Sequence, residues 1–287
     1  MRSKPIGTGP FKVVEFKRNE FMKLVRNPDY WRKGLPYLDG IEARIIASRS
    51  TRLLAFSSGE AELTFIADIT LPLIKDIRER RPTATCEVAA SSTYGNLMVN
   101  FEAPPFDKAE VRRAMALAID RKAFNDILGG GEMRIGGAML PAPEGAWGMP
   151  ESALSAMLGY GPDVEARRAE GRALMEKLGY SKDKRLKLKV VTRNLDIYRD
   201  PAVILIDQLR AVHFEGELDI IDTTVWYGRM QKKDYSIALN VTGVGIDDPD
   251  ANLVENFLCA SERNYTRYCN AEVDRLIGEQ SRTVDPA

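Results

Sequence analysis

Three carboxylates near the C-terminal end of the sequence form its densest group of side chains that could do chemistry. Asp247, Asp248 and Asp250 surround Pro249. Such a group can bind Ca²⁺, but the glycine-containing loop and the terminal bidentate glutamate of an EF-hand are lacking. Aspartates beside a proline also commonly form turns and caps. The residues alone leave a metal site and cap chemistry open, and they favour caps for Asp248 and Asp250.

Catalytic chemistry has little support in the sequence. The one histidine, His213, ends an amphipathic helix pattern beside Phe214, and no nucleophile lies in a recognisable motif. The triple glycine at 129–131 is not followed by Gly-Lys-Ser/Thr and is not preceded by an apolar strand, so it does not predict a phosphate-binding loop. Hydrolysis by carboxylates alone stays open as an alternative, because their pairing in space cannot be read from sequence.

Two of the three cysteines are close in sequence. Cys259 and Cys269 bracket nine residues, a spacing that suits a small closed loop. Spacing does not prove a bridge, since the geometry must also fit, and two unrelated buried thiols remain the alternative. Cys86 is either a buried free thiol or the partner of a cysteine outside this sequence.

The composition limits the class of protein. Lys and Arg total 41 and Asp and Glu total 41, which gives no net charge and so no electrostatic footprint for nucleic acid or an anionic membrane. The sequence contains no run of 18 apolar residues, so it predicts no transmembrane helix. Residues 1–5 are not followed by the apolar stretch of a secretory signal. A length of 287 residues with 44% hydrophobic content is enough for about two domains.

Strand and helix patterns alternate along the chain, which is typical of an α/β protein. The predicted strands are 12–16, 21–25, 41–46, 63–66, 86–89, 97–101, 186–192, 217–221 and 235–241, the first two as a hairpin. The predicted helices are 50–58, 70–80, one capped by Asp107, one from Asp120 to Leu128, 164–178, 201–212, 226–231 and 272–281. The strands at 186–192 and 217–221 with the helix between them predict a parallel βαβ unit. A glycine-rich stretch at 129–150 predicts a functional loop, such as a ligand lid.

Four separated blocks occur in the order found in one family. They are Gly7-Thr8-Gly9-Pro10-Phe11, Asn27-Pro28-Asp29-Tyr30-Trp31, Val111-Arg112-Arg113-Ala114, and Asp248-Pro249-Asp250 before Asn264-Tyr265. Together they resemble the solute-binding proteins of peptide-type ABC importers. The resemblance implies the α/β fold of a type II periplasmic binding protein, with two lobes joined by hinge strands.

The resemblance also implies a division of the chain. The first block lies near the middle of family members, so this sequence looks like a fragment with an incomplete lobe one. The implied divisions are 1–98 as part of lobe one, 99–243 as lobe two and 244–287 as the return segment of lobe one. Some dipeptide-binding members carry a cysteine pair around the same Asn-Tyr segment, which favours a disulfide between Cys259 and Cys269.

The resemblance directs attention to the segment after the last predicted hinge strand. Peptide-binding members carry there an aspartate that pairs with the ligand's α-amino group. Gly245 falls at that aspartate position and Thr242 at a usual tryptophan position, so the sequence departs from the pattern. Either Asp247 takes over the amine contact, or the ligand has no free α-amine; the second interpretation is slightly favoured.

Four further residues are candidates for ligand contact. Trp226 matches a cleft tryptophan of peptide-binding relatives, and Tyr94 lies near the hinge in relatives. Trp147 could contact ligand from the glycine-rich loop, and Arg229 could hold a ligand carboxylate bidentately. The alternatives are packing of lobe two for Trp226, loop packing for Trp147 and a solvated helix face for Arg229.

The function implied by the resemblance is capture of a solute. The protein would bind a peptide-like or small organic solute in the periplasm by closure of two lobes, as a monomer when full length and without a cofactor or metal. It would deliver the solute to an ABC permease, with no nucleic acid partner. A carboxylate-dependent hydrolase and a fragment without ligand competence are the alternatives.

Overall fold

The structure is a computed structural model that describes residues 5–64, 68–89, 93–243 and 245–283. The chain divides into two compact units. Unit 1 comprises Met1–Ile69 and Asp76–Ala84, and unit 2 comprises Thr70–Lys75 and Thr85–Ala287. The predicted lobe boundaries at 98/99 and 243/244 stay predictions. Among the described residues, no helix combines the length and the hydrophobicity that a membrane crossing requires.

Unit 1 contains a three-stranded antiparallel sheet and short helices. Its strands are β1 (Phe11–Lys17), β2 (Phe21–Arg26) and β3 (Gly40–Arg44), and helix α1 covers Arg49–Ser57. Helix α2 (Leu71–Arg80) spans the division between the units. The predicted hairpin of the first two strands is confirmed. The strand predicted at 86–89 is wrong, since those residues form no ladder, and the one predicted at 63–66 is wrong at 63–64 and otherwise falls outside the described residues.

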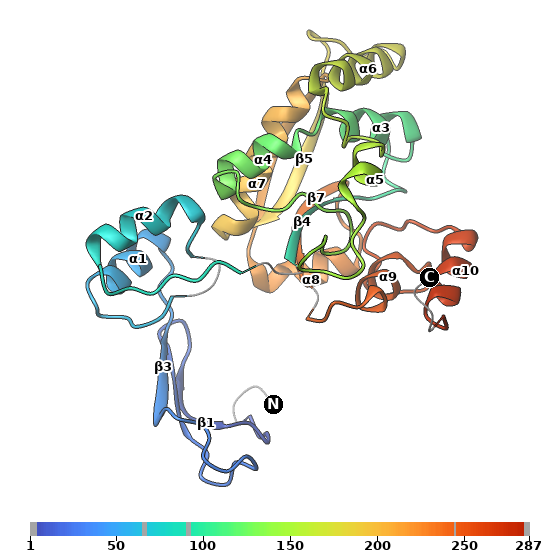
Figure 1. Ribbon diagram of the computed structural model, residues 1–287. Helices are drawn as coiled ribbons and strands as arrows, with labels where there is room; N and C mark the ends of the chain where they lie inside the picture. Colours follow the sequence, from blue (N-terminus) through green and yellow to red (C-terminus); the bar gives the residue numbers. More distant parts are fainter. Residues whose placement is uncertain (1–4, 65–67, 90–92, 244, 284–287) are drawn as a thin grey trace. The chain divides into compact units, whose positions relative to one another are not determined.

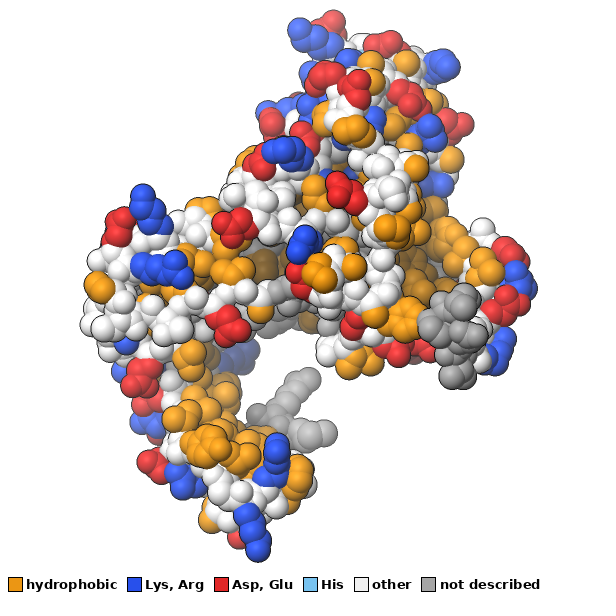
Figure 2. All heavy atoms as spheres, viewed as in Figure 1, with side chains coloured by type: hydrophobic (Ala, Val, Ile, Leu, Met, Phe, Trp, Pro, Cys, Tyr) orange, Lys and Arg blue, Asp and Glu red, His pale blue; other side chains and the backbone are white. Residues whose placement is uncertain are grey.

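The sheet of unit 1 has one apolar and one charged face. Its register places Val13, Leu24 and Ile41 in one row, and Phe16, Met22 and Ala43 in another row on the same face. The opposite face carries the row Glu15, Lys23 and Glu42. No residue of these three strands is fully buried, and hydrophobic side chains gather at the surface over the sheet (Figure 2).

Unit 2 is built on a four-stranded mixed sheet (Figure 1). The order of its strands is β4-β7-β5-β6. Strand β5 runs parallel to both β6 and β7, whereas β4 is antiparallel to β7. The predicted parallel βαβ unit is therefore confirmed as β5, α7 and β6. The strands are β4 (Thr93–Val99), β5 (Leu186–Arg193), β6 (Phe214–Ile221) and β7 (Ile237–Gly243).

One face of this sheet carries the main core. Helix α7 (Asp196–Arg210) packs on β5, β6 and β7, and α6 (Val164–Lys177) packs on α3 (Ala109–Ala118). The apolar spacing of α3 buries one stripe against this core. The cluster includes the fully buried side chains Val111, Ala114, Met175, Val190, Leu209, Val212, Phe214 and Ile237.

The opposite face of the sheet is covered by helix α8 (Thr223–Gln231). Trp226 and Met230 of this helix pack against Met98 of β4, Val191 of β5 and Ala238 of β7. In each strand these residues alternate with residues of the main core, because successive side chains of a strand point to opposite faces. The two faces of the sheet thus have separate apolar clusters.

The predicted helix ends are partly confirmed. Asp120 caps α4 (Arg121–Gly129), accepting from Ala123 N, and Gly130 ends it with a positive φ of 59°. The predicted cap at Asp107 is wrong, because the N-cap residue is Lys108 and makes no side-chain cap bond. Asp248 does cap a helix, α9 (Pro249–Phe257), accepting from Asp250 N at 2.8 Å.

Two helices escaped the sequence prediction. They are α9 and the short α5 (Glu151–Ser155). The last helix, α10 (Ala271–Gln280), agrees with the predicted one within a residue. Proline at the first position of α9 is compatible with a helix start, since the N–H that it lacks has no intrahelical partner there. The sequence therefore predicted the cap at Asp248 but not the helix that follows it. The cap predicted for Asp250 is wrong, because Asp250 lies inside α9 and its carboxylate accepts from Ser281 Oγ.

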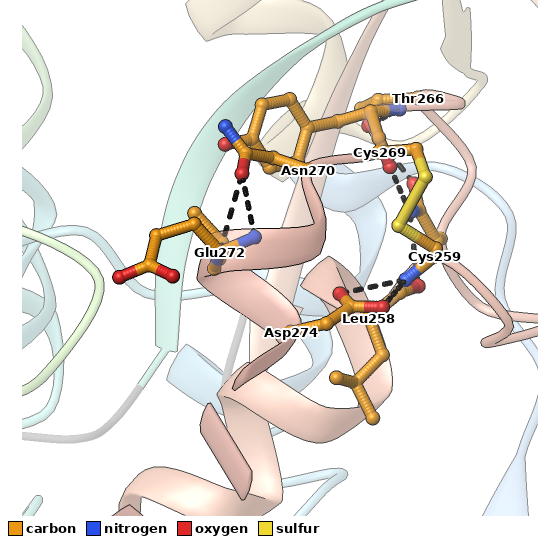
Figure 3. The surroundings of a disulfide bond; sticks show 10 residues. Leu258, Cys259, Thr266, Cys269, Asn270, Glu272 and Asp274 are labelled. Atoms are coloured by element: carbon orange, nitrogen blue, oxygen red, sulfur yellow. Dashed lines mark hydrogen bonds between the residues drawn. A yellow bond between two sulfur atoms is a disulfide. The ribbon is translucent and has the colours of Figure 1, made fainter. Parts of the chain in front are cut away.

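A disulfide joins Cys259 and Cys269 between α9 and α10, as predicted (Figure 3). Their Cα atoms are 4.7 Å apart. The backbone N–H of Cys259 donates to the carboxylate of Asp274, and Asn270 caps α10 by accepting from the N–H groups of Glu272 and Val273. The disulfide loop is therefore attached to the first turn of α10 at both ends. Cys86 is a free, partly buried cysteine.

Candidate functional site

One edge of the unit 2 sheet gathers the ends of several strands. The parallel strands β5, β6 and β7 all terminate there, at Arg193, Ile221 and Gly243. The antiparallel strand β4 begins at the same edge, because Thr93 pairs with Gly243. In open α/β sheets, ligands bind outside the carboxyl ends of the parallel strands. This edge is therefore the candidate site, and we call it the sheet edge.

The α8 face of the sheet changes character as it approaches the sheet edge. Met98, Val191 and Ala238 lie in the apolar cluster under α8. The next residues of the same face toward the edge are Asn96, Arg193 and Asn240, which are polar or charged. The strands thus position polar side chains over the sheet edge while their inner ends hold the core.

Arg193 is the most unusual side chain at the sheet edge. It is only 7% exposed, and its guanidinium stacks over the ring of Tyr198 at 3.8 Å from the centroid. The rings of Trp226 and Tyr227 lie within cation–π range at 5.3 and 5.7 Å. Its Nη2 donates to Asn240 Oδ1 at 3.2 Å, whereas its buried Nε has no hydrogen-bond partner. This arginine was not predicted from the sequence.

Nothing in the described part of the chain neutralises Arg193. No carboxylate of the described residues lies within ion-pair distance of it. A buried charge is ordinarily paired, because leaving water without a partner is costly. Burial raises the pKa of Tyr198, although the nearby positive charge of Arg193 opposes that shift. The sheet edge therefore offers a fixed positive charge to an anionic group.

Tyr94 lies at the sheet edge, but its hydroxyl is already engaged. It donates to Asn252 Oδ1 at 2.8 Å, and Asn252 is fully buried on α9. Asn252 Nδ2 in turn donates to the carbonyl of Ala138 in the glycine-rich loop. Burial raises the pKa of Tyr94, and the hydrogen bond to Asn252 partly opposes this. Tyr94 thus joins β4, α9 and the loop, and ligand contact by it stays a prediction.

Asp247 and Trp147 are brought together although 100 residues separate them. Asp247 Oδ2 accepts from the backbone N–H of Ala146 at 2.7 Å, and Trp147 Nε1 donates to the carbonyl of Asp247 at 3.1 Å. The Trp147 side chain is 46% exposed. Gly245 has open space around it, since a Cβ there would meet nothing within 4 Å. The contact of Asp247 with an α-amine therefore stays a prediction, and one of its oxygens already holds the loop.

Trp226 and Arg229 lie on α8, and both side chains are already engaged by other residues of unit 2. Trp226 is 1% exposed and packs in the apolar cluster, which supports the packing alternative for this residue. Arg229 makes ion pairs with Asp219 at 2.8 Å and with Asp234 at 3.6 Å. Its guanidinium is thus satisfied within unit 2, and ligand contacts for both residues stay predictions.

Thr242 joins the polar residues of the sheet edge. Its hydroxyl donates to Asn96 Oδ1 at 3.2 Å and lies 3.4 Å from Asn240 Nδ2. The sequence pointed to Thr242 but not to Asn96, Asn240 and Arg193. Polar residues that close apolar strands were the signal that could have found them, because ligand-binding residues cluster at strand ends of this kind of sheet.

The described residues contain no group of three or more His, Cys, Asp or Glu side chains placed to hold a metal ion. Asp248 and Asp250 are instead used locally: Asp248 caps α9, and Asp250 Oδ1 accepts from Ser281 Oγ at 2.6 Å. His213 is 7% exposed and its Nε2 lies 3.1 Å from Glu176 Oε1. These groups are explained by local structure.

Comparison with known proteins identifies the family. Residues 2–264 match the bacterial extracellular solute-binding proteins, family 5 Middle, and the chain belongs to this family. It is 24% identical over 293 residues to di/tripeptide-binding protein 1 of Pseudomonas aeruginosa, a match that covers 99% of this chain and 52% of the relative. It is also 24% identical over 293 residues to the glutathione-binding protein GsiB of Shigella flexneri, covering 99% of this chain and 54% of that protein.

Solved structures share the fold. Haemophilus influenzae OppA, in complex with RPPGFSPFR, superposes with a TM-score of 0.83 at 20% identity, covering 97% of this chain and 54% of OppA. Staphylococcus aureus NikA, in complex with Ni(L-His)2, gives a TM-score of 0.79 at 21% identity, covering 99% and 58%. These likenesses confirm the predicted fold class. The chain spans about half the length of the curated relatives that it matches.

Proposed function

We propose that this chain is part of the solute-binding component of an ABC importer. In this proposal the protein captures a peptide-like or small organic solute in the periplasm and delivers it to a membrane permease. Capture occurs by closure of two lobes, of which residues 99–243 form most of one. The protein turns over no substrate, and as a full-length monomer it needs no cofactor.

The observation that carries this proposal is the buried, unneutralised guanidinium of Arg193 at the sheet edge. A carboxylate of the solute would supply the missing negative charge. Such charge-assisted bonds are stronger than neutral ones and gain further strength when a site closes and excludes water. Tyr198 and Tyr227 provide aromatic surface beside the guanidinium for the rest of the solute.

The relatives support a carboxylate-bearing solute. The relatives include di/tripeptide-binding and glutathione-binding proteins, and unmodified di- and tripeptides and glutathione all carry carboxylates. Recognition of an α-amine has less support in this chain, because Gly245 occupies the position where the family resemblance implies an aspartate, and Asp247 already accepts from Ala146 N. We therefore propose the carboxylate as the anchored group of the solute.

A panel of three probes tests this proposal. Alanyl-alanine, its N-acetyl derivative and its C-terminal amide are titrated into the 287-residue chain and, in parallel, into the longest natural polypeptide that contains this sequence. Native mass spectrometry weighs the retained probe, and calorimetry gives the affinity. The two probes with a free carboxylate are expected to bind, and the amide is expected to bind at least about tenfold more weakly.

Variants of Arg193 locate the effect. Arg193→Met is expected to abolish the preference for a free carboxylate, and Arg193→Lys to restore only part of it, because lysine keeps the charge but lacks the planar fork. Arg113→Met is the matched control, since Arg113 is exposed and paired with Glu170. Equal binding of the amide and the free acid would contradict the proposal. It would also be contradicted if neither polypeptide retained either of these probes. Preference for the free amine would restore Asp247 as an amine partner.

A further inference from the structure

We propose that Asn240 and Thr242, supported by Asn96, form a hydrogen-bond relay that orients the guanidinium of Arg193 without neutralising it. The three side chains are positioning residues for Arg193. This inference rests on the proposed function, because the relay has a purpose only if Arg193 receives an anionic group of the solute.

The relay crosses three neighbouring strands on one face of the sheet. Arg193 Nη2 on β5 donates to Asn240 Oδ1 on β7 at 3.2 Å. Asn240 Nδ2 lies 3.4 Å from Thr242 Oγ1, and Thr242 Oγ1 donates to Asn96 Oδ1 on β4 at 3.2 Å. Asn96 and Asn240 are directly opposite in the β4–β7 ladder, so their strands fix the ends of the relay. Each hydrogen bond of the relay is therefore donated in the same direction, from Arg193 through Asn240 and Thr242 to Asn96.

Arg193 has only N–H donors, so the Asn240 amide turns its oxygen to Arg193 and its NH₂ group to Thr242. The Thr242 hydroxyl accepts from that NH₂ group and donates its one hydrogen to Asn96 Oδ1. A side chain at 242 without an acceptor would leave the NH₂ group of Asn240 without this partner and loosen the amide that holds Arg193. The residue at 242 thus acts on Arg193 through Asn240.

A neutral relay leaves the charge of Arg193 available. An aspartate or glutamate in place of Asn240 would make a buried ion pair and consume the charge. An amide oxygen holds one nitrogen in place and leaves the net charge at +1, while Tyr198 fixes the plane of the guanidinium by stacking on it. The free positive charge is the feature that an incoming carboxylate can use.

The relay also gives a physical reason for threonine at 242. A valine at this position would fill similar space but has no acceptor for Asn240 Nδ2. Position 242 pairs with Tyr94 across the β4–β7 ladder, and the Tyr94 hydroxyl is used by Asn252. The hydroxyl of Thr242 is thus the group at the sheet edge that is placed to set the orientation of Asn240.

The first test replaces Asn240 by aspartate, which separates positioning from packing. Asn240→Asp keeps the shape and gives Arg193 an internal carboxylate. Thermal stability is expected to be kept or increased, while affinity for N-acetyl-alanyl-alanine is expected to fall at least about tenfold, because the probe's carboxylate then competes with an internal one. Unchanged affinity in this variant would overturn the relay.

The second test removes the hydroxyl at 242 and needs no ligand. The side-chain Nε–H signal of Arg193 is assigned in a ¹⁵N spectrum of the 287-residue chain by its loss in Arg193→Lys. Thr242→Val is expected to shift this signal and to speed its exchange with water, and Thr242→Ser is expected to restore both. Thr51→Val, an exposed position in α1, is the control and should leave the signal in place.

The two tests distinguish failure of the relay from failure of the proposed function. If no probe binds but Thr242→Val alters the Arg193 signal, the relay holds and the solute-capture proposal fails. If probes bind through Arg193 but neither Thr242→Val nor Asn240→Asp changes the signal or the affinity, the relay is overturned and the proposed function stands.

Discussion

Units 1 and 2 differ in how far they bury the apolar side chains of their sheets. The sheet of unit 2 is covered on both faces, by α7 with α3 on one and by α8 on the other. The described residues of unit 1 bury only Ala55, Phe56 and Ile77 among apolar side chains, and none of these lies in its sheet. Hydrophobic burial is the dominant favourable term in folding. The stability of this chain therefore resides in unit 2.

The largest expected effect follows from separating the two units. A fragment of residues 85–287 is expected to fold cooperatively, whereas a fragment of residues 1–84 is expected to stay largely unfolded, because its sheet exposes Val14 at 59% and Phe16 at 57%. Circular dichroism in the near ultraviolet with urea titration measures both. A sigmoidal transition for residues 1–84 at micromolar concentration would show that unit 1 is self-sufficient.

A single substitution made once in each unit gives a finer comparison. Leu209 in α7 is fully buried in the unit 2 core, while Leu54 in α1 is 61% exposed. Leu209→Ala is expected to lower the free energy of unfolding by about 2 to 5 kcal/mol, since it removes buried methyl groups and leaves a cavity. Leu54→Ala is expected to change it by less than about 0.5 kcal/mol.

Chemical denaturation of the 287-residue chain measures both leucine variants under identical conditions. Both residues are helical and the substitution is the same, so helix propensity cancels from the difference. Equal losses of stability in the two variants would contradict the comparison, because they would mean that unit 1 packs as tightly as unit 2.

The sequence predicted the main elements of both units, and the predictions that failed, most of them in unit 2, have physical reasons. Periodicity reports burial, and the core stripe of α3 and the strands β5 to β7 are buried, so their patterns were clear. The strand predicted at 86–89 fails because four residues of mixed polarity had no ladder partner to support them. Local pairing still predicted the β1–β2 hairpin, since a charged turn between two alternating stretches is a short-range signal.

The candidate site shows where sequence reasoning stops. Tyr94 and Thr242, which lie at the sheet edge, were named because they match positions of the family that the chain resembles. Trp226 matched a family position too, yet its 1% exposure comes from contacts with β4, β5 and β7 that no local pattern reveals. Arg193 was missed because its significance lies in a missing partner, and the absence of a partner is a property of three-dimensional structure.

The disulfide is expected to contribute less than the core. Replacing both Cys259 and Cys269 by serine is expected to lower the free energy of unfolding by about 2 to 3 kcal/mol, because a bridge over a loop of this length limits the entropy of the unfolded chain. Inside the loop, the buried Asn264 donates to the carbonyls of Leu258 and Tyr268, so local order should also decrease.

Thermal and urea unfolding of the double serine variant check this value. Cys86→Ser is the control, because Cys86 is free and only partly buried. Its effect is expected to stay below about 0.5 kcal/mol. A loss in the control as large as in the double variant would show that the bridge is not what stabilises the segment between α9 and α10.

The smallest expected effect concerns alkaline pH and again belongs to unit 2. Burial raises the pKa of Tyr94, Tyr198 and Tyr235 above the ordinary value, and all three lie in unit 2. The folded chain therefore keeps protons that the unfolded chain loses above about pH 10. Stability that these tyrosines contribute is fully present below that pH and is lost as pH rises further toward their folded-state pKa values.

Tyr235→Phe isolates this effect, which matters because Lys233 acts with the opposite sign. Burial lowers the pKa of Lys233, so its contribution to stability increases with pH up to about 10.5. At neutral pH the phenylalanine variant is expected to lose about 1 kcal/mol, because the Tyr235 hydroxyl no longer donates to the carbonyl of Tyr265. Between about pH 10 and 11 the difference in unfolding free energy between this variant and the unaltered chain is expected to narrow, since phenylalanine has no proton to lose.

Tyr37→Phe, at an 85% exposed position in unit 1, is the control and should leave the urea midpoint unchanged throughout this pH range. A constant gap between Tyr235→Phe and the unaltered chain across this range would mean that alkaline unfolding does not begin at the buried tyrosines of unit 2.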